Sequence, residues 1–79
     1  MPIDYGQKTL VLHGIVTVDE AEELLEWLQT HPAATADLAA CTHLHPANLQ
    51  VLMAAACRVS AWPADAGLRV WLETALSPQ

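Results

Sequence analysis

Short runs of strand-forming residues alternate with amphipathic helical patterns along this chain of 79 residues. The alternation predicts strands over residues 8–14, 35–38 and 58–62, each followed by a helix. Strands separated by helices are expected to run parallel and to be joined by right-handed crossovers. Residues 1–5 fit a further short edge strand. The chain therefore predicts one α/β domain over residues 1–79, with three or four strands in a small, mostly parallel sheet.

The three predicted helices each carry apolar residues at the spacing i, i+3, i+4, i+7. The expected core-facing residues are Ala21, Leu24, Leu25 and Leu28, then Leu49, Leu52, Met53 and Ala56, and finally Leu68, Trp71, Leu72 and Ala75. Thr17 and Glu20 have the spacing of a capping box at the start of the first helix. Pro32 is expected to end that helix.

The predicted strands alternate apolar residues with polar or mixed ones. Strands covered by helices on both faces are usually apolar throughout, so all the helices are expected on one face, as in a β/α superhelix. The other face would be open to water or a partner. Strict alternation through residues 58–62 places Trp62 on this open face. An exposed tryptophan there would favour a protein interface, either with another protein or in a homodimer.

Charge and composition argue against several functions. The formal net charge is −6, with only three Lys and Arg residues, so the chain is not expected to neutralise nucleic-acid phosphates or an anionic membrane surface. No apolar run reaches the roughly 18 residues of a membrane span. The first residues lack a signal-peptide pattern, which predicts a cytoplasmic protein. Without a glycine-rich phosphate loop or a catalytic constellation, neither an enzyme nor a cofactor is expected.

The segment Cys-Thr-His-Leu-His, residues 41–45, is the chemically most pointed part of the sequence. Cys41, His43 and His45 are legitimate zinc or copper ligands, and alternate positions of an extended segment share one side. His13, near the end of the first strand, would be a fourth ligand. The competing interpretation is a small buried cysteine with histidines that cap the next helix. In that interpretation Leu44 and Leu49 are the apolar anchors of the loop.

The stretch from Asp37 through the second helix resembles the core of the STAS domain, the fold of bacterial anti-sigma-factor antagonists. That family has a strand ending in Asp-hydrophobic-Ser and then Asp-Ser-x-Gly-Leu at the start of a helix. Residues 37–39 here are Asp-Leu-Ala, and residues 45–49 are His-Pro-Ala-Asn-Leu. The resemblance extends over roughly residues 8–76. Pro46 stands where the family has the serine that a partner kinase phosphorylates.

This resemblance implies a protein–protein interaction module in bacterial regulation or signalling, without a phospho-switch at the usual serine. A regulatory kinase-like or sensor protein is the kind of partner it implies. The candidate interface residues are His43, His45, Asn48 and Trp62. The alternative is a small metal-binding protein that uses Cys41, His43 and His45.

Overall fold

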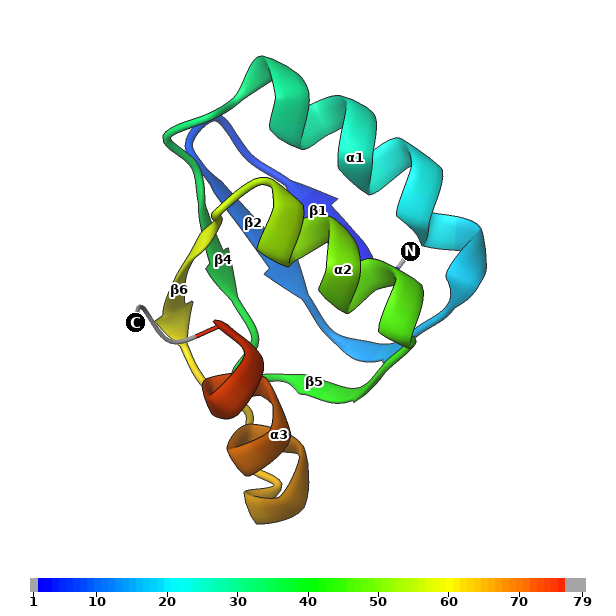
Figure 1. The fold of residues 1–79 in the computed structure, drawn as a ribbon, viewed down its shortest axis with the longest axis vertical. Coiled ribbons are helices and arrows are strands. Elements are labelled where there is room, and N and C mark those ends of the chain that lie inside the picture. Colours follow the sequence, from blue (N-terminus) through cyan, green and yellow to red (C-terminus); the bar gives the residue numbers. More distant parts are fainter. Residues whose placement is uncertain (1, 77–79) are drawn as a thin grey trace.

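The structure is a computed structural model that describes residues 2–76 (Figure 1). Its elements are, in chain order, β1 (Ile3–Tyr5), β2 (Thr9–Leu12), β3 (Gly14–Val16), the 3₁₀ turn η1 (Val18–Glu20), α1 (Ala21–Thr30), β4 (Thr35–Asp37), β5 (Cys41–Leu44), α2 (Pro46–Ala54), β6 (Arg58–Ala61) and α3 (Ala66–Leu76). The predicted mixed α/β fold is confirmed, including the short edge strand near the N-terminus.

Four strands form the main sheet in the order β1-β2-β4-β6. β1 runs antiparallel to β2, whereas the pairs β2–β4 and β4–β6 are parallel. Leu10 lies in register with Ala36, and Ala36 with Val59, so the apolar residues of three strands line one face. The sheet is therefore mostly parallel, as the alternation of strands and helices predicts.

The single strand expected over residues 8–14 is in fact two strands. β2 ends at Leu12, and β3 begins at Gly14, which has a φ of 63°. Glycine adopts this left-handed conformation without the steric penalty of a Cβ. After this break, β3 leaves the main sheet and pairs with β5 in a separate two-stranded parallel sheet.

Helices α1 and α2 lie side by side over the same face of the main sheet (Figure 1). Apolar side chains of the helices and the sheet form one core. Its largest fully buried side chains are those of Ile3, Leu10, Leu12, Leu24, Leu38, Leu44, Leu52 and Leu72. α3 packs against α2. The core is therefore a single layer between the helices and one face of the sheet.

Several helix positions differ from the predicted stripes. Trp71 is 40% exposed, and Leu25, Met53 and Ala56 are exposed as well, so their predicted core positions are wrong. In α3 only Leu72 is fully buried, whereas Leu68, Ala75 and Leu76 pack against the core but stay partly exposed. The predicted capping box is also wrong, since Thr17 precedes a 3₁₀ turn and its side chain makes no capping hydrogen bond.

Each of two parallel strand pairs contains one unpaired residue. Ala36 pairs with Val59 but Asp37 pairs with Ala61, which leaves Ser60 as the extra residue. Gly14 pairs with Cys41 but Ile15 pairs with His43, and here the extra residue is Thr42. An extra residue of this kind reverses the alternation of side chains in the rest of the strand.

Candidate functional site

The end of the fold near the start of α2 is built by two segments, residues 14–18 and 41–46, which we call the rim. Two hydrogen bonds fasten these segments together. The His45 backbone N–H donates to the Val16 carbonyl at 2.9 Å, and Asn48 Nδ2 donates to the Thr17 carbonyl at 2.7 Å. The rim is therefore held in one shape by the strand pair β3–β5 and by the first turn of α2.

His45 caps α2. Its Nδ1 accepts a hydrogen bond from the Ala47 backbone N–H at 3.0 Å, and its carbonyl accepts from Asn48 N–H at 2.9 Å. An accepting Nδ1 leaves the ring proton on Nε2. Pro46 occupies the first helical position, where no backbone N–H is needed. The capping interpretation of this histidine is confirmed.

Asn48 has no exposed surface, so its place among the expected interface residues is wrong. Its side chain turns inward to bond Thr17, because the third position of α2 faces the neighbouring rim segment. Within residues 2–76 its Oδ1 atom is buried without a hydrogen-bond partner. Asn48 therefore holds the rim in place through its bond to Thr17 and is not available to a partner.

The structure does not bring the proposed metal ligands together. Cys41 is buried and donates to the His43 carbonyl at 3.4 Å, whereas the His43 side chain is exposed beside Ile15. The expectation that Cys41 and His43 share one side is wrong, because Thr42 is an extra residue between them. His13 instead contacts Asp4, with 3.1 Å between Nε2 and Oδ2. Across residues 2–76, no three His, Cys, Asp or Glu side chains are grouped as a metal would require.

Both cysteines are buried free thiols. Burial raises the pKa of the Cys41 thiol, and its contact with the His43 backbone opposes this shift only in part. Burial also raises the pKa of Cys57. Since the thiolate is the nucleophile and the metal ligand, neither thiol is prepared for these roles at neutral pH.

The exposed surface of the rim is apolar at two positions that the sequence analysis missed. Ile15 is 63% exposed on β3, directly opposite His43, and Val18 is 51% exposed in η1. Residues 15–18 read Ile-Val-Thr-Val, a pattern typical of a buried strand, and only Val16 of these is buried. The two apolar anchors beneath the rim, Leu44 and Leu49, are buried as predicted.

A hollow of about 630 Å³ lies near the other end of α2. Trp62 lines it and packs against the core, so the expectation that Trp62 points from the open sheet face is wrong. The extra residue Ser60 reverses the alternation just before Trp62. The open face carries polar contacts instead, such as Thr9 with Thr35 at 3.4 Å between the hydroxyl oxygens. The predicted homodimer through the open face depended on Trp62, and this side chain does not lie there.

Across residues 2–76, every helix is too short or too polar to pass through a lipid bilayer. Compared with known proteins, the chain matches no protein-family model, no curated protein and no solved structure.

Proposed function

We propose that this chain is a STAS-type protein-binding module of bacterial regulation or signalling, and that it binds its partner at the rim. The observation that carries the proposal is the exposure of Ile15 and Val18. These two aliphatic side chains are three residues apart, on a backbone that is held by the hydrogen bond from Asn48 to Thr17. Exposed apolar side chains that gather at one place are typical of interaction sites. A cytoplasmic location and a kinase-like or sensor partner belong to the same proposal.

The rim suits binding because its shape exists before the partner arrives. The bonds from His45 N–H to Val16 and from Asn48 to Thr17 hold the backbone that presents Ile15 and Val18. A preorganised surface loses less conformational entropy on association, which leaves more free energy for binding. His43 lies in register with Ile15 and offers an exposed polar side chain to the partner.

The charge around the rim indicates the chemistry of the partner. Asp19 and Glu20 follow Val18 directly in η1, and the whole chain carries a formal net charge of −6. The complementary surface is apolar at its centre and basic at its margin, which also steers the encounter. Pro46 at the start of α2 has no hydroxyl group, so binding is not switched by phosphorylation at that position.

The test uses a double substitution, Ile15→Ser with Val18→Ser, at positions whose side chains are mostly in water. The control is Val70→Ser on α3, since Val70 is 64% exposed but lies outside the rim. Wild type and both variants are immobilised, proteins captured from a bacterial lysate are identified by mass spectrometry, and each is purified for titration calorimetry. Circular dichroism verifies the fold of the variants.

We expect the rim variant to bind the purified partner about 30-fold more weakly. Burial of each of these partly exposed side chains contributes about 1 kcal/mol, and 1.4 kcal/mol corresponds to a tenfold change in Kd. The Val70 variant should bind like the wild type. Equal binding by all three proteins, or a loss confined to the Val70 variant, would place the interface elsewhere and refute the rim as the site.

A further inference from the structure

We propose that the hollow at the C-terminal end of α2 binds a single-chain anionic amphiphile, with the apolar tail inside and the carboxylate at Arg58. This inference is independent of the rim, which lies at the opposite end of α2. The hollow has a volume of about 630 Å³ and is lined by Leu52, Met53, Ala56, Cys57, Arg58, Val59, Trp62, Ala75 and Leu76. Its size and mainly apolar lining are those of small-molecule sites in proteins.

Apart from Arg58, the side chains that line the hollow are apolar except for the Cys57 thiol and the Trp62 indole N–H. Cys57 Sγ already donates to the Ala34 carbonyl at 3.5 Å. Trp62 is turned into the hollow by the irregularity at Ser60, whose Oγ donates to the Ala36 carbonyl at 3.2 Å. Such irregularities commonly redirect a side chain beside a binding site. Because the lining is mainly apolar, the part of a ligand that enters the hollow is expected to be an alkyl chain.

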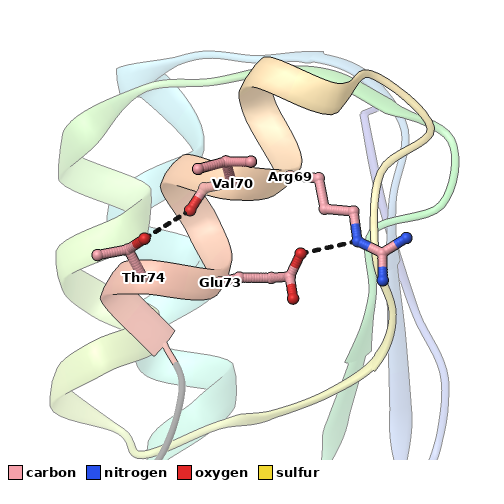
Figure 2. A network of polar contacts seen from close by, with 4 residues as sticks. All are labelled: Arg69, Val70, Glu73 and Thr74. Carbon is pink, nitrogen blue, oxygen red and sulfur yellow. Dashed lines mark hydrogen bonds and ion pairs between the residues drawn. The ribbon is translucent and has the colours of Figure 1, made fainter.

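The one charged residue that lines the hollow selects the head group. Arg58 is the only charged residue in the lining, and its side chain is exposed. Lys and Arg number three against nine acidic residues. Arg69 is already bound to Glu73, with 2.8 Å between Nε and Oε1, and the neighbouring Thr74 hydroxyl donates to the Val70 carbonyl (Figure 2).

Arg58, by contrast, makes no ion pair within residues 2–76. An arginine that is free at the margin of an apolar hollow recognises a carboxylate through charge-assisted hydrogen bonds. These observations together select a ligand with one negative charge and an alkyl chain, in preference to a neutral or cationic amphiphile.

The test is a titration of the ¹⁵N-labelled chain with hexanoate, octanoate and decanoate at pH 7.5, followed by NMR. The indole N–H signal of Trp62 reports on the hollow, and those of Trp27 and Trp71 are internal controls. We expect saturable shifts of the Trp62 signal. Each added methylene group should lower Kd about fourfold, from the usual free energy of burying one such group.

Two variants separate the charge from the hollow. Arg58→Gln should weaken octanoate binding by up to about fivefold, the upper end for a solvent-exposed ion pair, and leave the affinity for 1-octanol unchanged. Arg69→Gln is the matched control and should bind octanoate like the wild type. Octylammonium should bind more weakly than either of the other eight-carbon ligands.

Three results would overturn the proposal. One is the absence of a saturable Trp62 shift up to the solubility limit of decanoate. Another is equal affinity for octanoate, 1-octanol and octylammonium, which would remove Arg58 from recognition. The third is binding to phosphatidylglycerol vesicles without any octanoate shift, which would assign the anion to a membrane surface instead of a free amphiphile.

Discussion

Ala56, just after α2, adopts a left-handed backbone conformation with a φ of 51°. Its N–H donates to the Met53 carbonyl at 3.1 Å, and the Cys57 N–H donates to the Leu52 carbonyl at 3.1 Å. These are the two bonds of a Schellman motif, in which this position is usually glycine. Here an alanine occupies this position, so a residue with a Cβ adopts a conformation that favours glycine.

Ala56→Gly should therefore stabilise the protein. The left-handed conformation costs a residue with a Cβ about 1–2 kcal/mol, while glycine increases the entropy of the unfolded chain by about 0.4–1 kcal/mol. Because Ala56 is exposed, little packing is lost with its methyl group. The net gain is about 0.5–1 kcal/mol, which raises Tm by about 2–8 °C in a domain of this size.

The assay is thermal and urea denaturation followed by circular dichroism, with Ala54→Gly as the control. Ala54 is also exposed but belongs to α2, where the same change should destabilise by about 0.5–1 kcal/mol. The expected result is therefore two shifts of opposite sign from one chemical change made two residues apart. A lower Tm for Ala56→Gly would show that this conformation is not strained in the folded protein.

Four further predictions concern stability and reactivity. Gly14→Ala should destabilise by about 0.5–1 kcal/mol in urea denaturation, because φ is 63° and no atom lies within 4 Å of the added Cβ, so the cost of the left-handed backbone is offset only in part by the lower entropy of the unfolded chain. Leu49→Ala should cost about 2–5 kcal/mol by the same assay, since its buried side chain leaves a cavity. Burial of the phenol is the main cause that raises the pKa of Tyr5 from its usual 10.0 to about 12, and the negative charges of Glu23 and Glu20 add to this shift. The free energy of unfolding should therefore fall as the pH rises from 10.0 to about 12, because in this range the phenol ionises only in the unfolded chain. Urea denaturation of Tyr5→Phe should show a smaller fall over the same pH range. Cys41 and Cys57 should react slowly with a disulfide reagent at pH 8 and quickly in denaturant, since burial raises the pKa of both thiols; equal rates in the two conditions would contradict their burial.

Part of the candidate site follows from local sequence. Pro46 at the first helical position and a polar side chain before it are local signals of a helix start, and His45 does cap α2. Leu44 and Leu49 are buried as the apolar pattern predicts. The exposed pair Ile15 and Val18 was not predicted, because an apolar run after Gly14 has the same local pattern whether it is buried or exposed.

The order of the four main-sheet strands and the three helices follows from the sequence, since apolar periodicity and the positions of Gly and Pro are local properties of the chain. The separate strands β3 and β5 were not predicted. Leu10, Leu12 and Ala36 face the core by the same alternation. These positions depend only on which side of a strand or helix a residue occupies, and neighbouring residues set that side. The mostly parallel α/β fold could therefore be predicted.

The directions of the Trp62 and His43 side chains depend on how the strands pair and could not be predicted from local sequence. Both orientations depend on a single extra residue, Ser60 in one strand pair and Thr42 in the other. An extra residue arises from the register between two strands that lie far apart in the sequence, as the bond from Ser60 Oγ to the Ala36 carbonyl illustrates. A prediction from strict alternation does not consider the neighbouring strand. It therefore assigns the side chains that follow an extra residue to the wrong face of the sheet.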